Sequence, residues 1–216
     1  ALGPWTLPEI ALFYGLITPA FALAEGVGRG FDNFDTLVKR GDFDRLLLRP
    51  RSTVLQVAAQ EIQLMRLGRL LQGLLVLIVA ANALDVSWTF GRVGLAVFTV
   101  LGGACLFYGL FVIQATISFW TVETLELMNI LTYGGSEFGA YPVTLYPGKI
   151  AKFLTYVVPL ACVTYFPALA LLGRTDEAFG SSLAFQCLAP GMGVLFLLAA
   201  LQAWKIGVRH YRSTGS

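Results

Sequence analysis

The chain has 216 residues, of which 56% are hydrophobic and only 13% are charged, and its mean hydropathy is +0.72. Soluble domains are about one quarter charged, and a soluble fold of this composition would expose large apolar patches. The composition therefore excludes an ordinary soluble protein and predicts an all-α, polytopic membrane protein with one domain over residues 1–216. The net charge of +2 gives no indication of a basic binding surface, and we expect no nucleic-acid partner.

Four stretches approach the length that a membrane-spanning helix requires, about 20 predominantly apolar residues. They are residues 7–28, 70–88, 93–122 and 178–204. Glu9 and Glu25 lie near the two ends of the first stretch. Pro190 is expected to kink the last one.

The segment between the third and the last stretch has two interpretations. Residues 153–173 are uncharged but contain two prolines, which fits a kinked span or two short re-entrant helices. Residues 121–147 are apolar and aromatic apart from three glutamates, and can instead form a span whose acidic side chains face the protein interior. Periodicity does not decide whether 153–173 or about 119–140 is the outward crossing.

Basic residues indicate the orientation of the chain. Eight of its fifteen Lys and Arg residues lie within residues 29–69, namely Arg29, Lys39, Arg40, Arg45, Arg49, Arg51, Arg66 and Arg69. The positive-inside rule therefore places residues 29–69 and the basic C-terminal tail in the cytoplasm. The N-terminal end is then external. We accordingly expect six spans in the full protein, with the first one missing from this chain.

The charged stretch "KRGDFDRLLLRP", residues 39–50, is unusual in so apolar a chain. Gly41 and Pro50 are expected to delimit a short helix. Within it, Phe43, Leu46 and Leu47 recur at helical spacing and predict an apolar ridge that suits a groove on a soluble partner. The alternative is an amphipathic helix that is held at the membrane surface by anionic lipid.

Two longer motifs resemble the ABC-2 type transporter permeases. The segment "VKRGDFDRLLLRPRSTVLQVAAQEI" is similar to the cytoplasmic loop between the second and third spans of that family. The segment "NILTYGGSEFGAYPVTLYPGKIAKFLTYVVPLACVTYFPALALLGR" is similar to its fifth span and outer hairpin. The resemblance covers essentially the whole chain, and the best match is a bacterial subfamily that was formerly described as a domain of unknown function.

The resemblance implies a type V exporter fold in the bacterial cytoplasmic membrane, with six spans and a cytoplasmic C-terminus. It favours an outward crossing at about 119–140, followed by an external re-entrant hairpin at 141–173. It also implies a second permease chain, identical or homologous, and separate ABC ATPase subunits that hold ATP and Mg. The residues expected to couple to the ATPase are Arg40, Gly41, Asp42, Phe43, Asp44, Arg45, Leu46, Leu47, Arg49 and Pro50.

Residues that can line a substrate path are Glu25, Glu123, Glu126, Tyr133 and Glu137. Ionisable side chains at membrane depth are costly and usually face a cavity or a partner, so they suggest a hydrophobic or cationic xenobiotic as the substrate. Alternatively, Glu25, Glu123 and Glu126 lie at the inner interface, either solvated or paired with arginines such as Arg29 or Arg66.

Catalysis on this chain is not expected. The sequence contains no G-x-x-x-x-G-K-[ST] motif for ATP and one histidine, and it offers no metal-ligand cluster or covalent catalytic centre. No cofactor is therefore expected on the chain itself. The alternatives to an ATP-driven permease are an ATP-independent secondary transporter and a membrane-embedded lipid-modifying enzyme.

Overall fold

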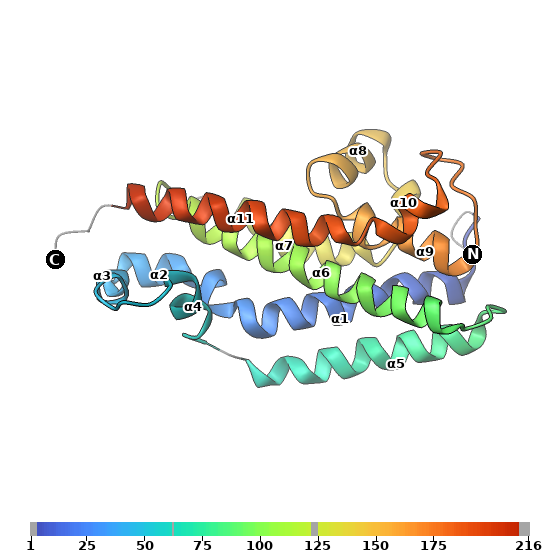
Figure 1. Cartoon of the computed structure of the whole chain (residues 1–216), viewed down its shortest axis with the longest axis horizontal. Helices are drawn as coiled ribbons and strands as arrows, with labels where there is room; N and C mark the ends of the chain where they lie inside the picture. Colours follow the sequence, from blue (N-terminus) through green and yellow to red (C-terminus); the bar gives the residue numbers. More distant parts are fainter. Residues whose placement is uncertain (1–3, 62, 122–124, 212–216) are drawn as a thin grey trace.

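The computed structural model describes residues 4–61, 63–121 and 125–211, and these residues contain helices but no β-strand. Long helices lie side by side in a bundle, with shorter helices at both of its ends (Figure 1). The long helices are α1 (Leu7–Asp32), α5 (Leu67–Ala83), α6 (Phe90–Ile117), α7 (Leu125–Gly139) and α11 (Gly191–His210). The short ones are α2 (Phe34–Lys39), α3 (Asp42–Leu47), α4 (Thr53–Ala58), η1 (Leu64–Arg66), η2 (Val143–Leu145), α8 (Gly148–Tyr156), η3 (Ala161–Val163), α9 (Tyr165–Leu172) and α10 (Leu183–Leu188).

Four helical segments are long and apolar enough to cross a bilayer, and they match the four stretches predicted from hydropathy. They are Leu7–Lys39, Leu64–Ala83, Phe90–Ile117 and Gly191–His210. The break expected at Pro190 is confirmed, because α10 ends at Leu188 and α11 begins at Gly191. The loop α2–α4 and the end of α11 lie at one end of the bundle, and the N-terminus and α8–α10 lie toward the other (Figure 1).

The segment between α6 and α11 contains two shorter helices, α7 and α9, whose facing ends meet near the middle of α1. With 15 residues, α7 is about 22 Å long, which is too short for a hydrocarbon core of about 30 Å. A Cβ atom at its last residue, Gly139, would lie 2.8 Å from Cγ1 of Ile17 in the middle of α1 and 3.3 Å from Cγ2 of Thr164. Thr164 directly precedes α9, so α9 begins at the level at which α7 ends. From there α9 continues toward the end of the bundle that lies near the N-terminus.

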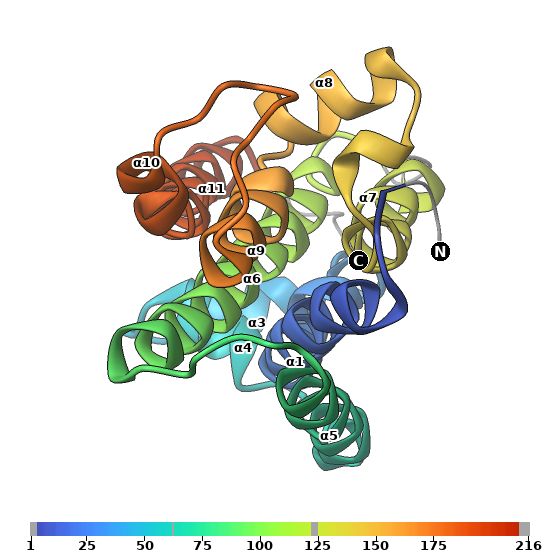
Figure 2. The same cartoon turned by 90° about the vertical axis from the view of Figure 1, so that its right-hand side faces the viewer.

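The segment between α7 and α9 bulges out of the bundle. It contains η2, α8 and η3, and α8 is bent by 72° from the helical segment Ala161–Leu172. Viewed along the bundle, α8 projects sideways from it (Figure 2). Of the expected crossing at about 119–140, the structure describes α7 (Leu125–Gly139), and residues 122–124 lie outside the described residues. The hairpin at 141–173 is not a surface appendage, because every side chain of η3 and all but the last of α9 are buried.

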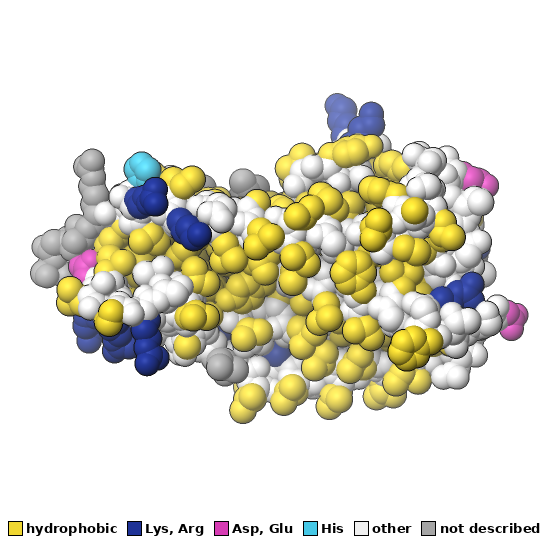
Figure 3. Space-filling view, in the orientation of Figure 1, with side chains coloured by type: hydrophobic (Ala, Val, Ile, Leu, Met, Phe, Trp, Pro, Cys, Tyr) yellow, Lys and Arg dark blue, Asp and Glu magenta, His cyan; other side chains and the backbone are white. Residues whose placement is uncertain are grey.

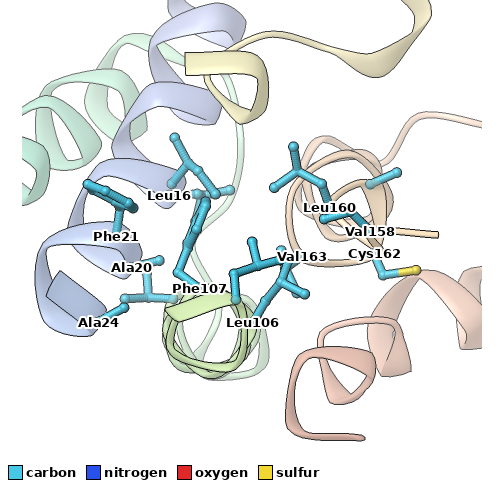
Figure 4. Close-up of a cluster of buried hydrophobic side chains, with 14 of the residues drawn as sticks. Leu16, Ala20, Phe21, Ala24, Leu106, Phe107, Val158, Leu160, Cys162 and Val163 are labelled. Carbon is cyan, nitrogen blue, oxygen red and sulfur yellow. The ribbon is translucent and has the colours of Figure 1, made fainter. Parts of the chain in front are cut away.

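The core lies between α1, α6 and η3. In Figure 4, Leu16, Ala20 and Phe21 of α1 face Leu106 and Phe107 of α6, and Val163 and Leu160 close the cluster from the third side. The rings of Phe21 and Phe107 meet edge to face, with centroids 5.0 Å apart. These side chains make α1 and α6 the centre of the bundle, whereas α5 and α11 leave most of their surface exposed.

Glycines bring the helices together where their backbones almost touch. A Cβ at Gly73 of α5 would lie 2.6 Å from Cδ of Pro19, and one at Gly193 of α11 would lie 1.9 Å from the carbonyl oxygen of Gly102 in α6. No larger residue fits at such distances. Small residues at helix interfaces are typical of membrane proteins, because close packing there replaces the hydrophobic drive that water supplies to soluble folds.

The distribution of apolar and basic side chains on the surface suits a protein that spans a bilayer. Hydrophobic side chains cover the flank of the bundle, and basic side chains gather at the end that holds α2–α4 (Figure 3). Exposed apolar residues follow η1 and α5 along their length, namely Leu64, Leu67, Leu71, Leu74, Leu75, Ile78 and Val79.

We predict that Gly193→Ala forces α6 and α11 apart and lowers the free energy of unfolding by about 1–3 kcal/mol, the usual cost of overpacking. Gly94→Ala is the matched control, because Gly94 is also helical but has no neighbour within 4 Å of an added Cβ. Thermal unfolding in detergent measures both variants. Equal stability of the two would show that the contact does not require glycine.

Candidate coupling surface and intramembrane charge cluster

The short helix that was expected between Gly41 and Pro50 is present as α3. Gly41, at its N-terminal cap, has a φ of 72°, a left-handed conformation that glycine adopts at little cost. The chain can therefore turn sharply between α2 and α3. On the surface of α3, Arg45 forms an ion pair with Asp42 one turn earlier.

Two of the three residues expected to form an exposed apolar ridge are buried. Phe43 has 0% of its surface exposed and Leu46 has 5%. The ring of Phe43 lies 5.0 Å from that of Phe34, and the Phe34 ring lies 4.9 Å from that of Trp204 on α11 and 5.2 Å from that of Phe119 after α6. The expectation that Phe43 and Leu46 are free for docking is therefore wrong, because both are used to fasten α3 to the bundle.

Hydrogen bonds hold the turn that follows α3. Nε2 of the buried Gln56 donates to the carbonyl oxygens of Leu46, at 3.1 Å, and Arg51, at 3.0 Å. The indole N–H of Trp204 donates to Oγ1 of Thr53 at 3.1 Å. Since these bonds join α4 and α11 to the turn, the tip of the loop has a defined position.

The tip itself is exposed and combines apolar with basic side chains. Leu48 is 85% exposed and Leu47 is 40% exposed. The exposed basic and proline side chains around them are Arg40, Arg45, Arg49, Pro50 and Arg51. We call residues 47–50 the loop tip. It is the part of the predicted coupling segment that a partner can reach.

A polar junction connects the loop to α6 and α7. Asp32, the last residue of α1, forms an ion pair with Arg29. The hydroxyl of Tyr133 on α7 donates to Oδ2 of Asp32 at 2.9 Å, and Nε2 of Gln114 on α6 donates to Oδ1 at 3.1 Å. Tyr133, which was expected along a substrate path, is thus part of a junction between three helices.

A second charge cluster lies one to two turns deeper in the bundle. Glu25 is 0% exposed, and its carboxylate lies 2.8 Å from Nη2 of Arg66 and 3.8 Å from Nη1 of Arg69. Arg69 also lies over the ring of Phe21, 5.0 Å from its centroid. The alternative interpretation of Glu25, as a carboxylate paired with Arg66, is confirmed.

Of the other glutamates expected along the substrate path, the structure describes the side chain of Glu137 alone. Glu137 is exposed, and its carboxylate lies 3.8 Å from Nη2 of Arg69, so Arg69 links α7 to α1. Glu123 and the side chain of Glu126 lie outside the described residues. The structure thus brings together Glu25 and Glu137 through an arginine between them.

Nothing in the sequence indicates the role of Asp176, which lies in the connection between α9 and α10. Its carboxylate accepts hydrogen bonds from the backbone N–H groups of Ala178, Phe179 and Ser181, at 3.0–3.2 Å. Burial acts to raise the pKa of Asp176, but the bonds from Ser181, Phe179 and Ala178 together outweigh it and hold the pKa below its usual range. Asp176 therefore orders the turn of residues 176–181.

A family model described as ABC-2 family transporter protein matches residues 1–215. The chain belongs to the ABC-2 transporter family. No curated protein and no solved structure matches it. Together with its apolar helices, the family makes this ABC-2 protein a multi-pass membrane protein, and the family supports a permease role for the chain.

We predict that Glu25→Gln destabilises this ABC-2 protein by on the order of 3 kcal/mol, because the substitution leaves two arginines without their buried counter-charge. Glu137→Gln is the control. Its side chain is 75% exposed, so its loss is expected to cost less than about 1 kcal/mol. Thermal unfolding in detergent measures both variants. Equal stability would contradict the assignment of Glu25 as a buried counter-charge for Arg66 and Arg69.

Asp176→Asn is expected to lower stability at neutral pH, because an amide accepts the backbone hydrogen bonds less strongly than a carboxylate. The folded-state pKa of Asp176 is below its unfolded value of about 3.9. The stabilisation is thus complete above that value and is lost as the pH falls through the folded pKa. The difference in unfolding free energy between wild type and variant should narrow in strong acid. A difference that does not change with pH would contradict the assigned role of Asp176.

Proposed function

We propose that this chain is the permease subunit of an ATP-driven ABC-2 exporter in the bacterial cytoplasmic membrane. The observation that carries the proposal is the loop tip, which is exposed at the basic end of the bundle, while Leu46 at its base is buried and Phe43 packs against the rings of Phe34, Phe119 and Trp204. A surface of this kind can receive a force and pass it to the membrane helices.

The aromatic cluster supports transmission because it joins helices that are far apart in the sequence. Phe34 leads directly back to α1, Phe119 follows the last turn of α6, and Trp204 belongs to α11. Buried aromatic rings pack at near-crystalline density and resist deformation. A push on α3 therefore displaces the ends of α1, α6 and α11 together, and the Asp32 junction extends the path to α7 through Tyr133.

The proposal assigns ATP and Mg to a separate ABC ATPase, because the sequence has no P-loop of its own. ATPase subunits contact the loop tip, and a second permease chain completes the pathway. In this arrangement the basic loop and the C-terminus face the cytoplasm. The pathway accepts a hydrophobic rather than a cationic substrate, since the negative charge of Glu25 is already balanced by Arg66 and Arg69.

We predict that Leu47→Asp combined with Leu48→Asp abolishes association with the cognate ATPase. Two carboxylates would replace the exposed apolar contacts at the centre of the loop tip. The double variant should insert and unfold like wild type, because neither side chain is buried. Co-purification of the ATPase with the permease from native membranes measures the effect.

The matched control is Leu47→Met combined with Leu48→Met, which keeps apolar side chains of similar volume and should retain the ATPase. Normal ATPase recovery with the aspartate variant would contradict docking at the loop tip. Leu46→Asp is unsuitable for this test, since Leu46 is buried and the variant would disrupt α3 itself.

A further inference from the structure

An apolar groove lies between α8, the α9–α10 connection and the first half of α11. Its volume is about 650 Å³, within the range of about 300–1,000 Å³ that is typical of small-molecule sites. Tyr156, Phe179 and Leu195 represent its three walls, and no lining residue is charged. Ser181 and Ser182 supply hydroxyl groups on the side of the connection that Asp176 orders.

The groove occupies one half of the membrane. All of its residues on α11 lie between Met192 and Ala199, within about 14 Å of the start of that helix at 1.5 Å per residue. Because the hydrocarbon core is about 30 Å thick, the groove lies in the half that is remote from the basic loop. By the positive-inside rule, this half is the outer leaflet.

The helix α8, which forms one wall of the groove, is attached to the bundle halfway along the length of the bundle. Before α8, the hydroxyl of Tyr146 donates to the carbonyl oxygen of Phe138 in the last turn of α7, at 2.9 Å. After α8, Val163 of η3 lies 3.9 Å from the Cβ position of Gly103 in α6. α8 is therefore attached at membrane depth and projects sideways from there (Figure 2).

Two lysines are exposed on α8, Lys149 and Lys152, and basic side chains stand out over this helix in Figure 3. Neither lysine forms an ion pair with any residue that the structure describes. Lys152 lies four residues before Tyr156 and thus on the same face of the helix, one turn from the groove wall. A cation at membrane depth is costly without water or an anion beside it.

We propose that the groove and the two lysines together bind an acidic phospholipid of the outer leaflet. One acyl chain lies in the groove, and the phosphate lies at the ammonium groups of Lys149 and Lys152. An acidic headgroup supplies the missing counter-charge, whereas a zwitterionic lipid brings a cation of its own. The site requires neither the ATPase nor the loop tip, so it is independent of the proposed coupling.

The test uses the purified chain, without ATPase, in nanodiscs of phosphatidylcholine that contain a trace of phosphatidylglycerol with a photoreactive acyl chain. After irradiation, mass spectrometry should locate the cross-links on the groove segments of α8, α10 and α11. Unlabelled phosphatidylglycerol should compete, and extra phosphatidylcholine should not. Lys149→Gln and Lys152→Gln should each weaken this competition about fivefold.

A matched pair of variants tests the groove itself. Leu195→Trp fills it and should abolish labelling, whereas Leu198→Trp, which is exposed on the same helix but outside the groove, should not. Equal competition by the two lipids in wild type, or full labelling of Leu195→Trp, would overturn the proposal.

Discussion

The fold depends on a few points at which helix backbones approach closely. Within a bilayer, apolar side chains gain nothing by leaving lipid for a helix interface, so association relies on packing. Glycines permit such packing between α1 and α5, between α1 and α6, and between α6 and α11, where Gly102 and Gly193 are in direct contact. These contacts bring the ends of α1, α6 and α11 together, and only then can Phe34, Phe119 and Trp204 form one cluster around Phe43.

Charged side chains are distributed unevenly between the two halves of the bundle. The half near the basic loop contains the Asp32 junction and the Glu25 cluster, and every carboxylate in them that the structure describes has a partner. The other half is apolar around the groove, apart from the lysines on α8. Burying the charge of Glu25 is tolerable because two arginines offset the cost of removing it from water. The same pairing leaves little unbalanced charge to attract a cationic substrate.

The loop tip shows how a correct local prediction can lead to a wrong contact. The spacing of Phe43, Leu46 and Leu47 does describe one helix, and that helix exists. Spacing, however, says only which residues share a face and not what the face meets. Phe43 meets four aromatic rings, three of them from distant parts of the chain, namely those of Phe34, Phe119, Trp204 and Tyr211. Leu46 is buried beside it, and Leu47 and Leu48 are left exposed. The apolar side chains that remain exposed for the proposed partner are therefore Leu47 and Leu48.

The main features that the amino-acid sequence predicts correctly are local ones. Runs of about 20 apolar residues, the helix break at Pro190 and the concentration of arginines in one loop can each be recognised within a short window, because bilayer thickness and backbone chemistry act on neighbouring residues. Three features depend instead on contacts between distant segments. These are the meeting of α7 and α9 near the middle of α1, the pairing of Glu25 with Arg66 and Arg69, and the groove beside α8. Hydropathy cannot predict them, because each arises from how helices pack and not from the composition of any one helix.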